Sequence, residues 1–345
     1  MGIRIIAIAF LLGASITSAH AAWEKVPLPE RAQQTPFAFM EFANPNLGYA
    51  SILETIWPEN FLIYRDGRWN LTRLGGMFQG CADDISLLPN GYGWLCGTHG
   101  GLYTLHYTAR TWGNGGWDEV ENPYSKPPGY EGLGGPMSVA AEEDVWFLFS
   151  KPNRILRYKD GKWEFKPYDL PAALGYVYDL CFVSADEAWA SGTGGFAHYK
   201  NGEWRYVPGP PASGPEFTAP NDGWANYYEA GQVLHYDGSS WSVSFSCPGY
   251  KTDSIGFYDR NNGWAAFGKY EVGARLFKFE SGKWGEVRLP NKYGVCEPTP
   301  LSPTEAWFVG SEYEPPRGYI TYFYHWHTEP NVKPTSLGKI KTLFK

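Results

Sequence analysis

The sequence has few charged residues and few of the residues that build metal or redox centres. Asp, Glu, Lys and Arg make up 19% of 345 residues, and there are only 7 His, 5 Cys and 4 Met. It contains no CxxC pair, no Cys–His cluster, and none of the short motifs of serine hydrolases, zinc proteases or P-loop proteins. We therefore expect no cofactor, no metal site and no catalytic residues.

Net positive charge and long apolar runs are also missing. The formal net charge of −7 does not suit a nucleic-acid-binding protein, which needs clustered Lys and Arg. The one long apolar stretch, residues 5–16, is shorter than the roughly 20 residues that span a bilayer. It follows Arg4 and precedes the small-residue sequence Ala19-His20-Ala21, which is typical of a signal-peptide cleavage site. We expect residues 1–21 to be a signal peptide and the mature protein to be periplasmic or secreted, not membrane-spanning.

An exported chain with five cysteines has at least one that is unpaired within the chain. One or two disulfides are compatible with an oxidising compartment. Cys81 and Cys96 are closest in sequence and are the first choice for a pair, although a two-residue turn at Asn90-Gly91 would not place them opposite each other. The pairing therefore stays open.

Glycine and aromatic residues are abundant, with 41 Gly, 16 Trp, 24 Tyr and 20 Phe, and many of them recur in a fixed order. An aromatic residue, a turn containing Gly, and a Trp form a first repeated motif. Its copies are YRDGRW (64–69), WGNGGW (112–117), YKDGKW (158–163), YKNGEW (199–204), YDGSSW (236–241) and FESGKW (279–284). Asp-Gly and Asn-Gly pairs favour tight hairpin turns, so each copy predicts a β-hairpin.

A second motif alternates with the first and follows a polar turn. Its seven copies are LGYA (47–50), YGWL (92–95), DVWF (144–147), EAWA (187–190), DGWA (222–225), NGWA (262–265) and EAWF (305–308). Two hairpins per repeat give four strands at a period of about 43 residues, which is typical of propeller blades.

The first motif has only six copies, and the seventh Trp is Trp23, near the start of the mature chain. The last repeat in turn stops after its third strand. We predict an all-β, seven-bladed propeller over residues 22–327, whose last blade is closed by the N-terminal strand. Residues 328–345 form a basic tail, either a loose extension or a partner-binding segment.

The segments DGWANYYEAGQVLHYDGSSW and EAWASGTGGFAHYKNGEW resemble the BNR/Asp-box-like repeats of bacterial secreted propellers. They are also similar to the repeats of the photosystem II assembly factor family, a seven-bladed propeller. The resemblance covers residues 23–326. It departs from a true Asp-box, Ser-x-Asp-x-Gly-x-Thr-Trp, because an aromatic residue replaces Ser and most copies are one residue shorter. The resemblance implies the propeller fold and an assembly function.

The histidine in His198-Tyr199 recurs at the third-strand position of other repeats. His106, His235 and His325 are assigned to the same position, where Arg157 and Lys278 also occur. A catalytic histidine is normally unique, so a replaceable one indicates a scaffold role. His325 and His327 share one strand face and are candidate metal ligands, but no third ligand is apparent nearby.

The loops that vary in length between repeats are expected to join the second to the third strand of a blade and one blade to the next. All of these loops lie at one end of the ring. Loops on a rigid scaffold commonly carry function. The candidate binding residues there are aromatic and acidic: Trp57, Tyr130, Glu131, Tyr176, Tyr228, Glu229, Tyr250, Tyr270, Glu271, Tyr313 and Glu314.

We expect these residues to bind a protein partner, so that the chain acts as a non-enzymatic interaction or assembly module. The Tyr-Glu pairs of three successive loops, at 228–229, 270–271 and 313–314, are predicted to form one continuous patch. The alternative is a carbohydrate-binding or carbohydrate-active propeller, a lectin, glycoside hydrolase or lyase. A glycoside hydrolase would need two carboxylates about 5–10 Å apart, a distance that is measured in a structure.

Overall fold

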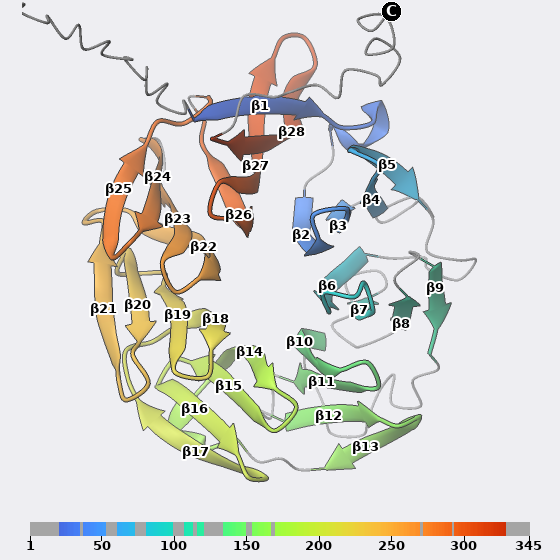
Figure 1. The fold of residues 1–345 in the computed structure, drawn as a ribbon, viewed down its shortest axis with the longest axis vertical. Helices are drawn as coiled ribbons and strands as arrows, with labels where there is room; N and C mark the ends of the chain where they lie inside the picture. Colours follow the sequence, from blue (N-terminus) through green and yellow to red (C-terminus); the bar gives the residue numbers. More distant parts are fainter. Residues whose placement is uncertain are drawn as a thin grey trace, which may run out of the picture.

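The protein is a ring of seven four-stranded antiparallel sheets around a central axis (Figure 1). This is the predicted seven-bladed β-propeller. The computed structural model describes residues 21–34, 37–52, 61–72, 81–98, 107–112, 116–120, 134–149, 154–166, 170–269, 272–291 and 293–328. Trp57, Tyr130, Glu131, Tyr270 and Glu271 lie outside the described residues, as do residues 1–20 and 329–345.

The strands follow one another from the inside of each blade to its outer edge. Blade one comprises β2 (Phe37–Asn44), β3 (Leu47–Ile52), β4 (Phe61–Arg65) and β5 (Arg68–Thr72). Blade two comprises β6 (Cys81–Leu87), β7 (Gly93–Thr98), β8 (Tyr107–Trp112) and β9 (Gly116–Glu119). Blade three comprises β10 (Gly134–Ala141), β11 (Asp144–Phe149), β12 (Arg154–Lys159) and β13 (Lys162–Lys166). Blade four comprises β14 (Val177–Ser184), β15 (Glu187–Gly192), β16 (Gly195–Lys200) and β17 (Glu203–Pro208). Blade five comprises β18 (Ser213–Ala219), β19 (Asp222–Tyr227), β20 (Gln232–Tyr236) and β21 (Trp241–Ser246).

Blade six comprises β22 (Lys251–Asp259), β23 (Asn262–Lys269), β24 (Gly273–Glu280) and β25 (Lys283–Val287). Blade seven contains β26 (Val295–Ser302), β27 (Glu305–Glu314) and β28 (Gly318–His327), and its outer strand is β1 (Ala22–Pro27). The pairing of β1 with β28 is antiparallel and places Trp23 opposite Trp326. The N-terminal strand therefore closes the last blade, as predicted from the unmatched Trp23.

Two-residue turns join the first to the second strand in every blade except blade two, and the third to the fourth strand in blades one, three, four and six. They lie at the end of the ring that we call the short-turn face. Asp66, Asp160, Asn201 and Ser281 have φ between 49° and 56°, and each precedes a glycine with positive φ. Two successive residues with positive φ are characteristic of type I′ turns, which match the twist of antiparallel strands. The opposite end, with the connections from second to third strands and between blades, is the variable-loop face.

The second-strand aromatic residues form contacts between blades. Trp94, Trp146, Trp189 and Trp224 are almost completely buried, and each contacts a third-strand aromatic residue of the following blade. The ring-centroid distances are 4.7 Å for Trp94–Tyr158, 5.2 Å for Trp146–Tyr199, 4.8 Å for Trp189–Tyr236 and 4.9 Å for Trp224–Phe279. Such pairs add about 0.5–1.5 kcal/mol beyond area burial, so the repeated Trp and Tyr residues stabilise the ring.

His198 belongs to the same periodic scaffold. Its Nε2 lies 2.7 Å from Glu187 Oε1, and its ring stacks on Trp189 at 4.2 Å. Equivalent groups of a carboxyl residue, a basic side chain and a Trp occur in blades three, five and seven: Asp144–Arg157–Trp146, Asp222–His235–Trp224 and Glu305–His325–Trp307. The contacts of His198 are therefore those of a packing residue.

The assignment of His106 to this position was wrong. The strand register of blade two places Arg110, not His106, opposite Trp94, and Arg110 Nη1 lies 2.8 Å from Glu143 Oε1. His106 lies outside the described residues. The error arose because the aromatic residue that follows the His, Arg or Lys in other repeats is replaced here by Thr111. The His-Tyr pair a few residues earlier therefore resembled the motif.

Polar side chains of the inner strands link neighbouring blades from blade one to blade seven. Glu41 Oε1 accepts a hydrogen bond from Leu87 N at 2.8 Å, and Glu216 Oε2 accepts one from Phe257 N at 2.9 Å. Asp84, Ser138 and Ser254 accept equivalent bonds from Met137 N, Phe182 N and Glu297 N, at the boundaries after blades two, three and six. These bonds satisfy backbone groups that no strand of the same blade reaches.

Three of the cysteines, Cys181, Cys247 and Cys296, are free thiols, so a second disulfide does not form. Cys81 pairs in register with Thr98, and Cys96 pairs with Asp84, so the two cysteines are on adjacent strands but not opposite each other. Their disulfide stays a prediction, because the side chain of Cys81 lies outside the described part. Among the described residues, no helix has the length and apolar character needed to cross a bilayer.

Candidate functional site

Exposed aromatic residues gather on the variable-loop face. The described residues include eight exposed large apolar side chains. Six of them lie on the strand ends and connections of this face: Tyr178, Tyr206, Tyr228, Val272, Tyr313 and Tyr319. Tyr258 lies instead near the short-turn face, and Val243 lies within the outer strand β21. The aromatic surface is therefore concentrated at the end of the ring where the connections vary in length.

A small cavity opens among these tyrosines at the boundary between blades four and five. Its volume is about 250 Å³, and we call it the tyrosine groove. Its lining comes from the start of β14, the connection into β18, and the end of β19: Tyr178, Pro211, Ala212, Ser213, Tyr227, Tyr228 and Glu229. Tyr176 extends the aromatic surface because its ring meets that of Tyr178 edge-on at 5.4 Å. The groove thus combines apolar walls with a few polar groups, as binding sites commonly do.

One lysine holds the acidic side of the tyrosine groove. Lys251 Nζ lies 3.0 Å from Glu229 Oε2 and 4.5 Å from the centre of the Tyr228 ring. The hydrogen bond with Glu229 raises the pKa of Lys251. Both side chains are exposed, so a ligand can compete for either member of the pair. Surface pairs of this kind add little to folding stability.

Tyr250 has a different setting, at the boundary between blades five and six. Lys269 Nζ and the guanidinium carbon of Arg275 lie 5.7 Å and 5.6 Å from its ring centre. Arg275 also forms a bidentate ion pair with Glu286, at 2.7 and 2.8 Å. The surroundings of Tyr250 are therefore basic rather than acidic.

A long hairpin of blade seven carries a second group of tyrosines. Strands β27 and β28 extend beyond the rest of their blade, and the hairpin projects from the ring in Figure 1. Near its tip the rings of Tyr313 and Tyr319 meet at 5.4 Å, and Tyr293 contacts Tyr319 at 5.7 Å. Tyr313 and Tyr319 are 51% and 63% exposed. They present apolar area to solvent with no covering element among the described residues.

Glu314 at the tip of this hairpin is already engaged. It accepts a hydrogen bond from the Tyr322 hydroxyl, and its oxygens lie 3.5 Å from Lys25 Nζ and 3.7 Å from Arg317 Nη1. The bond from Tyr322, with the neighbouring Lys25 and Arg317 charges, lowers the pKa of Glu314. Lys25 comes from β1, so this acidic group also holds the N-terminal strand.

Six of the predicted binding residues can be placed. Tyr176, Tyr228, Glu229, Tyr250, Tyr313 and Glu314 all lie on the variable-loop face. Tyr228 and Glu229 line the tyrosine groove and Tyr176 contacts its Tyr178, but Tyr313 and Glu314 lie on the separate hairpin of blade seven. The predicted continuous Tyr-Glu patch stays a prediction, because Tyr270 and Glu271 between these groups lie outside the described residues. Both placed glutamates are ion-paired, so neither presents an uncompensated negative charge.

Five residues that line the tyrosine groove were not among the predicted site residues: Tyr178, Pro211, Ala212, Ser213 and Tyr227. Tyr178 and Tyr227 stood at the ends of two loops that were expected on the variable-loop face, but their neighbours Tyr176 and Tyr228 were chosen as the candidate residues. A usable signal was the alternation in Tyr176-Val177-Tyr178, which puts both rings on one side of the chain. The contact of Tyr178 with blade five depends on the packing of two blades, which no local pattern encodes.

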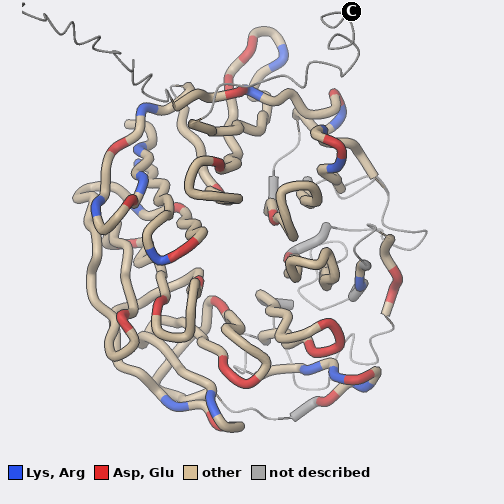
Figure 2. Tube along the Cα trace, viewed as in Figure 1, with Lys and Arg blue, Asp and Glu red and all other residues tan. Residues whose placement is uncertain are grey.

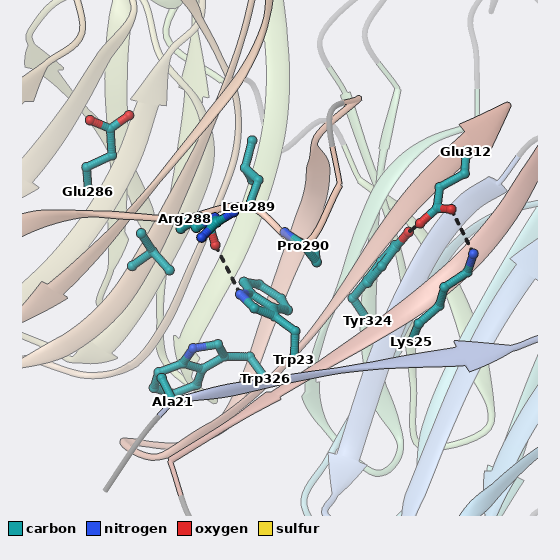
Figure 3. Close-up of a pocket in the computed structure, with 11 residues that line it drawn as sticks. Ala21, Trp23, Lys25, Glu286, Arg288, Leu289, Pro290, Glu312, Tyr324 and Trp326 are labelled. Atoms are coloured by element: carbon teal, nitrogen blue, oxygen red, sulfur yellow. Dashed lines mark hydrogen bonds and ion pairs between the residues drawn. The ribbon is translucent and has the colours of Figure 1, made fainter. Parts of the chain in front are cut away.

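A second cleft, of about 670 Å³, lies at the seam where the N-terminal strand joins the ring (Figure 3). Trp23 points into it from β1 and donates a hydrogen bond from Nε1 to the Arg288 carbonyl at 3.1 Å. On its other side, Glu312 accepts bonds from Lys25 at 2.7 Å and from Tyr324 at 2.6 Å. These contacts fasten β1 to blades six and seven.

Carboxyl groups with raised pKa values lie on the inner strands of the blades. Burial raises the pKa of Glu41 and of Glu216 to about 8, and that of Asp179 and Glu297 to about 6. Shifts of this kind mark candidate catalytic acids and bases. Here Glu41, Asp179 and Glu216 accept backbone hydrogen bonds from the following blade, which accounts for their position. Elsewhere acidic and basic residues are interleaved around the ring (Figure 2).

Similarity to known proteins was found at the level of structure, not of sequence. No model of a known protein family matches the sequence, and no curated protein matches it. Among solved structures, Ycf48 bound to a D1 peptide is 16% identical, with a TM-score of 0.59 over 88% of this chain and 94% of the other. Ycf48 from Cyanidioschyzon merolae is also 16% identical, with a TM-score of 0.57 over 89% and 98%. An inactive virginiamycin B lyase from Staphylococcus aureus with quinupristin is 15% identical, with a TM-score of 0.60 over 88% and 99%.

These identities are too low to transfer a ligand or a reaction, because one fold carries many unrelated functions. The similar structures include a lyase, and a prolyl endopeptidase is 13% identical with a TM-score of 0.57 over 84% of this chain and 47% of the other. What the neighbours share with this protein is the architecture of the whole ring. The chain is thus a seven-bladed β-propeller, similar in fold to the photosystem II assembly factor Ycf48.

Proposed function

We propose that this protein is an exported, non-enzymatic binding module that holds a segment of a partner protein on its variable-loop face. The tyrosine groove is the centre of the proposed site. The observation that carries the proposal is the concentration of exposed tyrosines on this face and around this groove. Tyrosine supplies a large contact area at low entropic cost together with a polar tip, and it is enriched in protein interfaces.

The size of the groove favours an anchor side chain over a whole small molecule. Its volume of about 250 Å³ is below the about 300–1,000 Å³ that is typical of small-molecule sites. A partner segment can insert one apolar or aromatic residue between Tyr178 and Tyr228 and place its neighbours over the surrounding loops. Glu229 and Lys251 at the edge would pair with polar or charged groups of that segment.

A precedent for peptide binding on this fold supports the proposal. The Ycf48 structure contains a bound D1 peptide, so a propeller of similar architecture takes a peptide from another protein. The precedent shows only that this fold can bind a peptide. Because the two sequences are 16% identical, it does not identify which residues of this chain would bind one.

The test begins with capture of the partner and then measures its affinity. The mature protein, biotinylated at one site, is incubated with a native extracytoplasmic extract, cross-linked, and the bound proteins are identified by mass spectrometry. The dissociation constant for the captured partner is then measured by calorimetry. We expect Tyr178→Ala and Tyr228→Ala each to weaken binding about tenfold, the usual effect of removing an aromatic anchor.

Tyr258→Ala is the matched control, because Tyr258 is 48% exposed, close to the 45% of Tyr228, but lies at the short-turn face. It should leave the affinity unchanged. A glycan array run with the same preparations tests the carbohydrate alternative, since tyrosine rings also stack on sugars. Binding to a glycan that Tyr228→Ala abolishes, with no protein captured, would replace a protein partner by a carbohydrate. Equal loss in all three variants would move the site away from the groove.

A further inference from the structure

Three side chains from the two ends of the chain meet where the ring is closed. Glu24, His325 and His327 each offer one oxygen or nitrogen, and these atoms all lie within 4.8 Å of one another. Glu24 lies on β1 directly opposite His325 on β28. His327, two residues further along β28, is on the same face of the strand, and the two imidazole rings are 5.2 Å apart.

His325 is held with one ring nitrogen directed towards this meeting point. Its Nε2 lies 2.8 Å from Glu305 Oε1, while its Nδ1 lies 3.9 Å from Glu24 Oε2. The ring also stacks on Trp307 at 4.4 Å, so its orientation is restricted on two sides. A carboxylate that accepts the proton of the second ring nitrogen is the usual support of a metal-bound histidine, because it sets the tautomer and makes the other nitrogen more basic.

The propeller repeat accounts for His325 but not for the other two residues. In blade four, His198 occupies the position of His325. Lys200 of blade four occupies the position of His327 of blade seven. Lys200 pairs with Glu187 at 3.1 Å, and the outer-strand residue opposite His198 is Arg205, not a carboxylate. Within the described part of the chain, only blade seven assembles a group of at least three potential ligands.

We propose that Glu24, His325 and His327 form a binding site for a divalent transition-metal ion. Two imidazoles and one carboxylate suit Zn²⁺, with Cu²⁺ and Ni²⁺ as competitors, whereas Ca²⁺ and Mg²⁺ prefer all-oxygen sites. Ligand bonds of about 2.0–2.2 Å require the three donor atoms to move closer together. The side chain of Glu24 is half exposed and can swing inward. Water would fill the fourth position.

The site joins the first strand of the ring to the last, so metal binding is coupled to ring closure. An ion that binds only the closed ring stabilises it by an amount that grows with the free metal concentration. The proposal concerns this seam alone. It is independent of the tyrosine groove, which lies at the boundary between blades four and five.

The experiment titrates Zn²⁺ into untagged, chelator-treated protein that begins at Ala22. We expect one ion per chain by calorimetry and by elemental analysis after dialysis, and a melting temperature that rises with Zn²⁺. The variant His327→Lys installs the residue found at this position in blade four, so it preserves the fold while removing a ligand. We expect it, and Glu24→Gln, to weaken Zn²⁺ binding at least tenfold and to abolish the stabilisation.

His198→Lys is the matched control in blade four and should bind Zn²⁺ like the unmodified protein. Absence of Zn²⁺ binding by the unmodified chain would overturn the proposal. So would equal affinity in the unmodified, His327→Lys and Glu24→Gln proteins, because the ion would then be bound elsewhere, for example by the free thiols. Loss of binding by His198→Lys as well would equally count against the seam.

Discussion

At the scale of single residues, two buried acids on the inner strands link neighbouring blades and also make the stability depend on pH. Glu41 and Glu216 link neighbouring blades through backbone hydrogen bonds, and burial raises the pKa of each carboxyl to about 8. Nearby acids add to the shift, Asp84 and Glu216 for Glu41, and Glu297 and Asp179 for Glu216. Both groups therefore retain a proton in the folded protein at pH values where the unfolded chain has lost it.

This difference predicts a loss of stability as the solution becomes more alkaline. Because the folded-state pKa is above the unfolded value, the free energy of unfolding is highest below about pH 4.5 as far as these two groups are concerned. It then falls as the pH rises through about 8. We expect a loss of roughly 4 kcal/mol per carboxyl between pH 5 and pH 9, because each unit of pKa shift corresponds to about 1.4 kcal/mol, and urea unfolding at pH 5, 7 and 9 measures this loss. The double variant Glu41→Gln with Glu216→Gln should flatten this dependence, whereas Glu203→Gln at the exposed outer strand β17 should not. The same slope in all three proteins would assign the pH dependence to other groups.

At the scale of the elements, the N-terminal strand β1 matters most, because it completes a blade that the rest of the chain leaves open. Trp23 packs on Phe308 at 5.1 Å and bonds to the Arg288 carbonyl, while Lys25 reaches Glu312. Without β1, the outer edge of β28 would expose unpaired backbone groups, which favours aggregation.

A truncation tests the contribution of this strand. A chain that starts at Glu30 should lose at least about 3 kcal/mol of unfolding free energy, comparable to the loss of one large core side chain. A chain that starts at Ala22 retains β1 and serves as the control. Calorimetric melting compares the two. Melting temperatures within a degree or two of each other would show that β1 is dispensable for the ring.

At the scale of the whole molecule, the proposed export is compatible with the position of β1. Strand β1 begins at Ala22, directly after the expected cleavage site, so removal of residues 1–21 would leave the ring complete. We expect the protein isolated from the extracytoplasmic fraction of the native cell to begin at Ala22, by intact-mass measurement. Ala21→Phe places a bulky residue at the cleavage site and should leave the precursor uncleaved, because signal peptides require small residues there. A full-length protein in the cytoplasmic fraction would contradict export.

The sequence by itself determined the blades. Asp-Gly and Asn-Gly turns act within a few residues, because only certain residues accept positive φ, and the spacing of Trp residues repeats with the blade. The number of blades, their four strands and the closure by Trp23 follow from those local signals. The periodicity of His198 also indicated its packing role correctly. The misplacement of His106 shows where this reasoning fails, at a repeat whose motif has lost its aromatic residue.

The tertiary structure decided which side chains meet. The tyrosine groove joins Tyr178 of blade four to Tyr228 of blade five, and Lys251 neutralises Glu229. The third ligand beside His325 and His327 is Glu24, which comes from the other end of the chain. A repeat pattern records the neighbours of a residue along its strand, whereas these contacts depend on how one blade packs on the next and on how the ring is closed. Side-chain packing across such boundaries is not periodic, and only the folded ring brings these residues together.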